Sequence, residues 1–407
     1  MKIPELVAPA GSLEKLEIAY LYGADAAYCG LKDYNLRNRA ENFTFKELKK
    51  AVLLSNKMKK KLYLTLNAYF YENDIKKLDS FLKRIEDTGC DTLIVSDPGV
   101  FLYIRERFKN FKIHISTQAN TTNSYAVKFW YNHGASRIIL ARELTLNEIK
   151  TIHKLLPDVE LEVFVHGAVC LSYSGRCFLS LYLTGRNANQ GDCAHPCRFE
   201  YALCENKRKE DLFPVFDIKR GTVVLSSKDL NLIRYIPSLI KSGVSAFKIE
   251  GRMKSLYYVA AVTAAYRKAI DAAVKKEKLP LFAVRELDSV SHRPFFKGFI
   301  FGRKEVASVT KKSYVRKYSF IGWIKKKISD GFYEIDIKNP LQSGLTYEIF
   351  RYDNPSSFLL LKDFTLFHLN GKKIESVPLL KIQDRGFIKT TLELKRGYII
   401  RKKISLT

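Results

Sequence analysis

The chain has 407 residues, which exceeds the size at which one hydrophobic core stops growing and predicts a domain of about 300 residues with a smaller companion. Hydrophobic residues make up 46% and aromatic residues 13% of the chain, which excludes an intrinsically disordered protein. The 69 Lys and Arg against 42 Asp and Glu give a net charge of +27. This charge predicts an anionic partner, either nucleic acid or a membrane surface, unless the whole proteome is basic.

The N-terminus and the cysteine content bear on the compartment. The first residues, MKIPELVAPAGS, lack a basic segment followed by a long apolar stretch, and no run of about 18 apolar residues occurs. We therefore expect a cytoplasmic protein with no membrane partner. Four of the seven cysteines lie between Cys170 and Cys197, and in a reducing compartment such a cluster favours a metal site over disulfides.

The first 255 residues alternate short apolar runs with helical stretches, a pattern typical of a parallel sheet. The predicted strands are Glu5–Ala8, Ala26–Gly30, Leu62–Ala68, Thr92–Asp97, Lys112–Gln118, Arg137–Glu143, Leu161–Gly167 and Ala246–Gly251. Eight such units make an α/β fold, a (β/α)8 TIM-like barrel over residues 1–305, the leading prediction. A doubly wound open sheet is the alternative, but the sequence has neither its GxGxxG turn nor a P-loop.

The segment between the seventh and eighth predicted strands is unusually long. It spans about 78 residues, roughly twice the spacing that a barrel normally uses. We therefore expect a cysteine-bearing insertion after strand seven, over about residues 168–245. It begins at the carboxyl end of a strand, which is the end where barrel enzymes carry their chemistry.

The chain changes character after the eighth strand. A long amphipathic helix is predicted over Leu256–Lys276, and from residue 311 short β-type runs alternate with turn signals such as Asn370-Gly371. Residues 311–407 are therefore predicted to form a small all-β barrel domain. This segment has 20 basic and 9 acidic residues, a net +11, which is about twice the charge density of the remainder and suits a domain that binds a phosphate backbone.

Several predicted strands alternate apolar and polar residues, so one face of each is polar. A polar barrel interior near the carboxyl ends predicts a substrate pocket. His114, and Glu162 with Lys248, fit an interior hydrogen-bonded network as well as a catalytic role. The catalytic candidates near strand ends are Asn67, Gln118, Glu143, His166 and Glu250, and Asp97, Arg142 and Arg252 also lie at such ends.

The clustered cysteines, Cys170, Cys177, Cys193 and Cys197, suit either a tetrahedral zinc ion or an iron–sulfur cluster, since both favour sulfur ligands. The absence of paired CxxC motifs tilts the choice toward iron and sulfur. A purely structural metal is a further alternative. Cys204 is a substitute for the fourth ligand, whereas Cys29 and Cys90 are predicted core residues.

The segment from Glu162 to Ser180, EVFVHGAVCLSYSGRCFLS, resembles the signature of peptidase family U32. Flanking runs match it as well: Tyr34 to Arg37, Asp97 to Gly99, His114 to Asn120, Arg142 to Leu144 and Lys248 to Lys254. The resemblance covers nearly the whole chain. In its length and its basic β domain, the chain is most similar to the tRNA-hydroxylation branch of this family. Members of that branch make 5-hydroxyuridine at the wobble position in a prephenate-dependent reaction.

The resemblance implies that the four cysteines ligate a [4Fe–4S] cluster, with Cys197 the least certain because some relatives have their fourth cysteine further downstream. It also implies tRNA, prephenate and iron–sulfur assembly proteins as partners. Other branches hydroxylate ribosomal RNA or act in ubiquinone synthesis.

Two sets of basic residues are assigned to binding. Arg142, Arg252 and Lys254 are predicted to hold the carboxylates of a small acid such as prephenate, unless they pair with Glu143 and Glu250. In the C-terminal segment the predicted RNA-binding residues are Lys311, Lys312, Arg316, Lys325, Lys326 and Lys327, with Lys317 nearby. The interleaved Tyr314, Tyr318 and Trp323 fit a small core better than stacking surfaces.

These patterns bear on three function classes. An RNA-modifying enzyme accounts for the charge, the polar pocket and the cysteines together. The family's older label is collagenase-like protease, but the sequence has no HExxH and no GxSxG, and cysteines that ligate a cluster cannot also attack a peptide bond with His166 or His195 as base. A non-catalytic RNA-binding protein explains the charge but not the pocket.

Overall fold

The computed structural model describes residues 3–37, 41–170, 172–199, 202–205, 208–214, 228–302, 314–371, 373–382 and 384–404. Within 202–214 only the backbone is described. In these ranges no helix combines the length and the apolar character that a membrane crossing requires.

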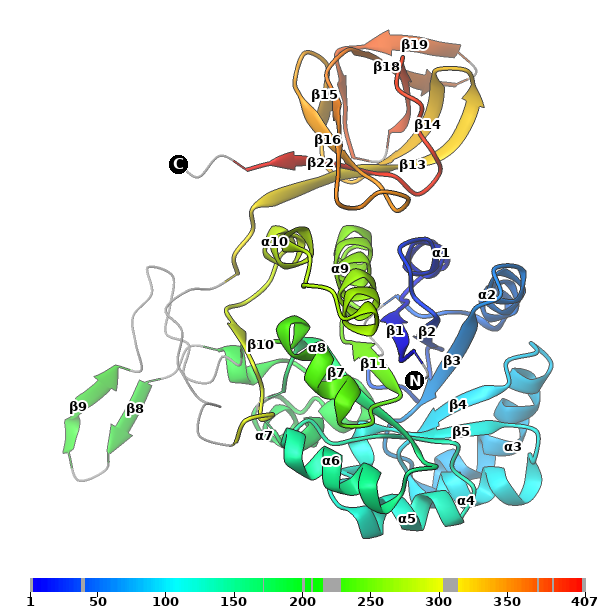
Figure 1. Ribbon diagram of the computed structural model, residues 1–407, viewed down its shortest axis with the longest axis vertical. Helices are drawn as coiled ribbons and strands as arrows, with labels where there is room; N and C mark the ends of the chain where they lie inside the picture. The colour runs from blue at the N-terminus through cyan, green and yellow to red at the C-terminus, as the bar shows by residue number, and fades with distance from the viewer. Residues whose placement is uncertain are drawn as a thin grey trace.

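Eight parallel strands close into a barrel (Figure 1). They are β1 (Glu5–Pro9), β2 (Ala26–Gly30), β3 (Lys61–Leu66), β4 (Thr92–Val95), β5 (Lys112–Ile115), β6 (Arg137–Ile139), β7 (Glu160–Ala168) and β11 (Ala246–Ile249). Each strand pairs with its neighbour in chain order, and β11 pairs with both β7 and β1, which closes the ring. The predicted TIM-like barrel and its eight strands are confirmed.

Helices cover the outside of the barrel, and their ends follow from local sequence. They are α1 (Leu13–Leu21), α2 (Phe45–Lys57), α3 (Glu72–Glu86), α4 (Pro98–Arg107), α5 (Ser124–Asn132), α6 (Leu146–Leu155), α8 (Ile236–Lys241), α9 (Leu256–Lys275) and α10 (Leu281–Ser289). Thr44 with Glu47, and Thr145 with Glu148, form capping boxes that satisfy the first backbone N–H groups of α2 and α6. The Asp97 side chain accepts from the Val100 backbone N–H, so Asp97 is the cap of α4.

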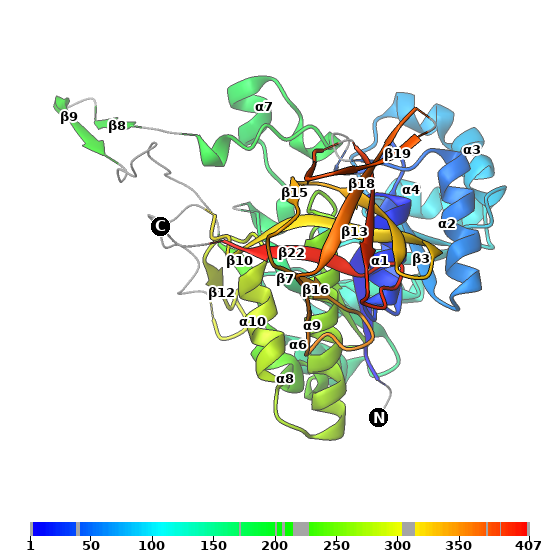
Figure 2. The ribbon, with the colours of Figure 1, turned by 90° about the horizontal axis from the view of Figure 1, so that it is seen from above.

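The chain leaves the barrel after β7. Short helices follow, at η2 (Tyr173–Gly175), α7 (Leu179–Thr184), η3 (Ala188–Gln190) and η4 (Pro196–Arg198), and then the hairpin β8 (Ala202–Glu205) and β9 (Arg208–Pro214). The segment returns as β10 (Asp229–Asn231), which pairs antiparallel with β7, beside η5 (Ile233–Tyr235) and β12 (Phe295–Phe296). Figure 2 shows α7 and this hairpin projecting at one end of the barrel.

The C-terminal part is a curved antiparallel sheet (Figure 1) in the order β17-β16-β22-β13-β14-β21-β18-β19. The strands are β13 (Tyr318–Ser329), β14 (Phe332–Ile337), β16 (Tyr347–Phe350), β17 (Leu359–Leu361), β18 (Phe364–Asn370), β19 (Lys373–Val377), β21 (Arg385–Thr390) and β22 (Ile399–Lys403), with β15 (Leu341–Gln342) and β20 (Leu379–Leu380) forming a separate pair. The all-β C-terminal region is confirmed. The exact domain limits at 305 and 311 stay predictions, because residues 303–313 lie outside the described ranges.

The C-terminal sheet packs tightly on the side of the barrel, against α1, α9 and α10. Tyr22 stacks on Phe350 with ring centroids 5.3 Å apart. Arg401, which is 2% exposed, forms ion pairs with Glu286 of α10 at 2.6 Å and with Glu348 at 2.9 Å. Phe350 and other sheet residues belong to the same continuous hydrophobic core as the barrel. Removal of the C-terminal part would therefore expose barrel core.

Candidate active site at the barrel mouth

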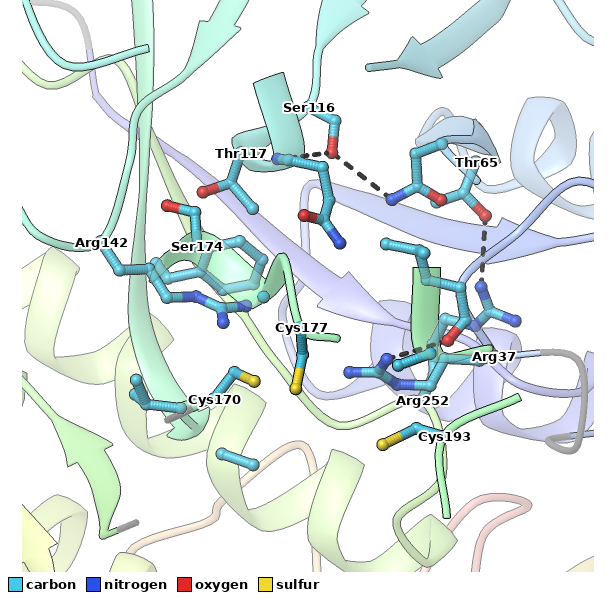
Figure 3. A pocket seen from close by; sticks show the side chains of 18 of the residues that line it. Arg37, Thr65, Ser116, Thr117, Arg142, Cys170, Ser174, Cys177, Cys193 and Arg252 are labelled. Carbon is cyan, nitrogen blue, oxygen red and sulfur yellow. Dashed lines mark hydrogen bonds between the residues drawn. The ribbon is translucent and has the colours of Figure 1, made fainter. Parts of the chain in front are cut away.

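A cavity of about 160 Å³ lies at the carboxyl end of the barrel, beneath the insertion. Figure 3 shows side chains from several strand ends and from the insertion converging on it. The polar and sulfur-bearing residues that line it include Arg37, Thr65, Asn67, Ser116, Thr117, Gln118, Arg142, Cys170, Ser174, Cys177, Cys193, His195, Cys197, Lys248 and Arg252. This location agrees with the prediction that the polar strand faces form a pocket at this end.

All four clustered cysteines line the cavity as thiols and not as disulfides. Figure 3 shows Cys170, Cys177 and Cys193 on different sides of the same space. Among the described residues, no three His, Cys, Asp or Glu side chains are close enough together to hold a metal ion. The thiols therefore share a cavity without forming a compact ligand set. The side chain of Cys204 lies outside the described residues.

Hydrogen bonds hold the cysteine-bearing loop in place. The Asn189 side chain accepts a hydrogen bond from the Cys177 backbone N–H and donates one to the Cys177 carbonyl. Glu143 accepts hydrogen bonds from the Ser174 backbone N–H at 2.5 Å and from the Ser174 hydroxyl at 2.7 Å. Glu143 is buried and is not among the residues that line the cavity. Its position is that of an anchor for the loop between Cys170 and Cys177, not of a catalytic group facing the cavity.

Arg252 is a buried guanidinium held by neutral oxygens. It is 4% exposed and donates hydrogen bonds to the Thr65 hydroxyl at 3.2 Å and to the side-chain carbonyls of Asn35, at 3.1 Å, and Asn42. Its Nε is buried without a partner, and in the described part of the chain no carboxylate pairs with it within 4 Å. A buried cation with spare donors favours an anionic ligand.

Arg142 and Arg37 contribute two more cations to the same cavity. Arg142 lies over the Phe164 ring at 4.2 Å from its centroid, and the described residues give its guanidinium no hydrogen bond or ion pair. Arg37 pairs with Glu250 at 3.4 Å. The predicted site residues did not include Arg37, because it lies in a loop after β2 where no strand periodicity marks the direction of its side chain. The family-like run from Tyr34 to Arg37 was the signal that could have found it.

Glu250 is the ion-pair partner of Arg37, and the charges of Arg142 and Arg252 also act on it from a greater distance. Burial raises its pKa, but the charges of Arg37, Arg142 and Arg252 outweigh this effect and hold the pKa below its usual value. The Tyr28 hydroxyl also lies 3.4 Å from its carboxylate. Glu250 is therefore held in its ionised form beside Arg37.

Asn67 and Gln118 place unsatisfied amide groups at the cavity. The Oδ1 of Asn67 and the Oε1 of Gln118 are buried without a hydrogen-bond partner in the described structure. The Nδ2 of Asn67 makes only a long contact, 3.4 Å, with the Ser116 hydroxyl. Buried polar groups normally have partners, so these two oxygens are exceptions. Their strand-end positions correctly placed both residues at the cavity, and their catalytic role stays a prediction.

The other end of the barrel interior is a paired network. Arg137 donates to Glu5 at 2.7 Å and to Glu162 at 3.1 Å, and Lys248 contacts the second oxygen of Glu162 at 2.8 Å. Burial raises the pKa of Glu5, but Arg137 and then Lys61 lower it to about 2. His114 packs against Tyr63 in this network, and burial lowers its pKa well below the usual value. The Nδ1 of His114 is buried without a hydrogen-bond partner among the described residues, so His114 contacts this network by ring packing and not by the hydrogen bonds that were predicted.

His166 and Lys254 do not line the cavity. His166 is 1% exposed and packs between Tyr266 of α9 and Phe295 of β12, and burial lowers its pKa to about 3. A register shift between β7 and β11 occurs where His166 pairs with Ile249, so the simple alternation assumed from sequence ends there. Lys254 instead donates to the Ser291 carbonyl at 3.3 Å.

The structure describes only some of the predicted RNA-binding residues of the C-terminal region. Lys311 and Lys312 lie outside the described residues. Arg316, Lys326 and Lys327 are exposed and Lys325 is half-buried at the end of β13. Lys327 pairs with Asp330 at 2.6 Å. Trp323 is fully buried and donates to Asp336 at 3.0 Å, so it belongs to the core, as expected.

The fold and the cavity define a TIM-barrel protein with thiol and guanidinium groups gathered at the carboxyl ends of its strands. The model of peptidase family U32 matches residues 11–310, which is more than half of the chain. The chain therefore belongs to this family, as its signature predicted.

Three relatives illustrate the range of names within the family. tRNA hydroxylation protein P of Escherichia coli K12 is 34% identical over 92% of this chain and 91% of its own. An uncharacterized protease of Methanocaldococcus jannaschii is 44% identical over 74% of each chain. The 23S rRNA 5-hydroxycytidine C2501 synthase of Escherichia coli K12 is 35% identical over 67% of this chain and 40% of its own. RNA hydroxylation and proteolysis are thus both named among the relatives.

Proposed function

We propose that this protein is an RNA hydroxylase that converts the wobble uridine of tRNA to 5-hydroxyuridine in a prephenate-dependent reaction. The observation that carries the proposal is that four thiols, three arginines and two amide oxygens without hydrogen-bond partners lie around one cavity. Two of the three relatives described above are named for RNA hydroxylation. The net charge of +27 supports an RNA substrate.

We propose that Cys170, Cys177, Cys193 and Cys197 ligate a [4Fe–4S] cluster, with zinc as the alternative. The donor set fits, because four thiols line one cavity and soft metals prefer thiolate ligands. An iron–sulfur cluster supplies one-electron transfer when bound, which suits the oxidation of a C–H bond to C–OH. Iron–sulfur assembly proteins would load it in the cytoplasm.

The arginines are proposed to bind the carboxylates of prephenate. Arg252 and Arg142 offer guanidinium groups that the described residues leave without carboxylate partners at ion-pair distance, and Arg37 replaces Lys254 as the third cation. Guanidinium groups match carboxylates with paired hydrogen bonds, and this geometry fixes the orientation of the acid. Asn67 and Gln118 would then hydrogen-bond the polar groups of the acid or of the base.

RNA contacts are proposed on two surfaces. On the insertion, Phe178 is 65% and Tyr182 is 77% exposed, and unstacked bases of a loop can stack on such rings. In the C-terminal region, Arg316, Lys325, Lys326 and Lys327 would contact phosphates. A target base must leave its stack to enter the cavity, as for other enzymes that modify bases.

The test is nucleoside mass spectrometry of tRNA from a deletion strain, its parent, and strains complemented with wild-type protein or with Arg252→Lys. We expect 5-hydroxyuridine to be missing in the deletion strain, restored by wild-type protein and reduced with the variant. Unchanged hydroxyuridine in the deletion strain would refute the proposal.

Peptidase activity is the second candidate, because the Sγ of Cys193 lies 3.8 Å from the Nδ1 of His195 at the cavity. This pair has the composition of a thiol nucleophile and its base. Purified protein without a cluster would then hydrolyse gelatin or casein and lose this activity in Cys193→Ala. Absence of hydrolysis, together with tRNA hydroxylation, removes this candidate.

A further inference from the structure

Lys248 is a buried lysine at the floor of the candidate active site. It lies on β11, is 3% exposed, and lines the cavity together with Arg252 and Phe164. Its Nζ lies 4.5 Å from the centroid of the Tyr28 ring and 5.8 Å from that of Phe164. The amine of this cavity-lining residue thus lies close to two aromatic rings.

Opposing effects act on the pKa of this amine. Burial lowers the pKa of Lys248, while its ion pair with Glu162 and the charge of Glu250 raise it, and Arg137 lowers it further. The direction that prevails for this pKa is downward. A desolvated lysine with a lowered pKa yields the neutral amine, which is the nucleophilic form, more readily than an exposed lysine does.

Glu162 lies close enough to that amine to accept a proton from it and to return the proton. One carboxylate oxygen lies 2.8 Å from the Nζ of Lys248, and the other accepts from Arg137 at 3.1 Å. Glu162 is fully buried, so it is held in one orientation between two cations. The condensation of an amine with a carbonyl group requires a neighbouring group that transfers protons. A fixed carboxylate beside the amine is such a group.

We propose that Lys248 forms an imine with the keto group of a 2-oxo acid whose carboxylate is held by Arg142 and Arg252. This rests on the proposed function for the identity of the cavity as the active site, and it names the class of small acid bound there. The same cavity surface offers an amine for a carbonyl and guanidinium groups for a carboxylate. A 2-oxo acid carries both groups on adjacent carbons.

The reaction is a condensation without change of oxidation state. The ammonium of Lys248 gives one proton to Glu162, the amine adds to the carbonyl carbon, and one N–H proton moves to the carbonyl oxygen to form a carbinolamine. Glu162 returns its proton to the carbinolamine hydroxyl, which leaves as water while the C=N bond forms as a protonated imine. The imine links the acid to β11 and fixes its orientation below the cysteines.

The experiment traps the imine with borohydride. The full-length protein is incubated with pyruvate, phenylpyruvate or prephenate at several concentrations, reduced with sodium borohydride, and mapped by peptide mass spectrometry. We expect a saturable secondary-amine adduct on Lys248 with at least one of these acids, and none without acid or without borohydride. The assay needs neither RNA nor an intact cluster.

Two variants serve as controls. Lys248→Arg keeps a cation beside Glu162 but cannot form an imine, so the adduct should disappear while the thermal unfolding profile stays close to wild type. Lys61→Arg changes a lysine at the opposite end of the barrel, paired with Glu5, and should leave the adduct unchanged. Because the wild-type map alone locates the adduct, a poorly folded variant does not remove the test.

The absence of an adduct on Lys248 with all three acids, or a saturable total adduct yield that is the same in wild type and Lys248→Arg, would overturn the proposal. Hydroxylated tRNA measured in parallel separates the two ideas. A protein that hydroxylates tRNA but yields no adduct retains the proposed function and refutes the imine. A protein that yields the adduct but hydroxylates no RNA supports the imine and refutes the proposed function.

Discussion

The two ends of the barrel interior are both rich in charge, but their partners differ. At the amino end, Glu5, Arg137 and Glu162 form a network of ion pairs between 2.7 and 3.1 Å. At the carboxyl end, Arg252 has only neutral oxygen partners and a buried Nε without any, and Arg142 rests on an aromatic ring. The difference separates ion-paired charges from guanidinium groups that have no carboxylate at ion-pair distance among the described residues.

The strongest test of the carboxyl end is Cys177→Ser. Loss of one thiolate ligand should abolish the visible absorption of anaerobically purified protein and reduce 5-hydroxyuridine to the level of the deletion strain. Cys90→Ala, in the barrel core away from the cavity, is the matched control and should retain both. Stoichiometric zinc without iron in the wild type would contradict this prediction.

Breaking the ion-pair network at the amino end of the barrel should lower the free energy of unfolding. Arg137→Leu leaves Glu5 and Glu162 without their shared cation, and breaking a buried pair in this way costs about 3–5 kcal/mol. Denaturant unfolding measures the loss. Arg267→Leu, which breaks the half-exposed pairs of Arg267 with Asp25 and Asp271, should cost about 1 kcal/mol or less. Equal losses of unfolding free energy in the two variants would contradict the prediction that the buried network stabilises the protein more than the partly exposed pairs do.

Acid should weaken the same network. The pKa of Glu5 is about 2 in the folded protein against an ordinary value of 4.5, because burial raises it but Arg137 and Lys61 lower it by more. Its carboxylate therefore contributes stability above about pH 4.5 that is lost as the pH falls toward 2, on the order of 3 kcal/mol. Unfolding free energies of Glu5→Gln should show a flatter acid dependence than those of Glu14→Gln. Parallel profiles would contradict the assignment.

Arg252→Lys should affect ligand binding more than folding. Lysine cannot reproduce the planar contacts with Thr65 and Asn35 or offer paired donors to a carboxylate. Losing about 2 kcal/mol of binding would raise the half-saturating prephenate concentration about 30-fold. Arg401→Lys, equally buried but far from the cavity in the packing against α10, should leave that concentration unchanged.

The smallest effect is expected in the C-terminal sheet. Lys325→Ala with Lys326→Ala should weaken tRNA binding modestly and reduce the slope of log affinity against log salt by about one unit for each phosphate that the variant no longer binds. Lys76→Ala on α3 is the control, with no change in slope. Titrations at several salt concentrations provide the measurement, and an unchanged slope in the double variant would place the RNA site on the barrel and insertion.

Much of the fold was predictable because its signals are local. Alternating apolar runs and helix caps such as Thr44 and Thr145 mark the eight strand–helix units without reference to distant residues. Strand ends were less accurate. The strand predicted to end at Gln118 ends at Ile115, because the Ser116 side chain caps a turn over Thr117–Ala119.

The amino-acid sequence by itself determined the barrel, the β-rich C-terminal region, the family, and the cysteines, Asn67, Gln118, Arg142 and Arg252 as cavity residues. Only the tertiary structure decided which buried charges have partners. Arg137 meets Glu5 across 132 residues, and Arg252 meets Asn35 across 217. The same long-range packing placed Arg37 at the cavity and turned His166 away from it. Strand alternation predicts the face of the sheet on which a side chain lies. The residue that it contacts there comes from another strand or loop, which alternation does not identify.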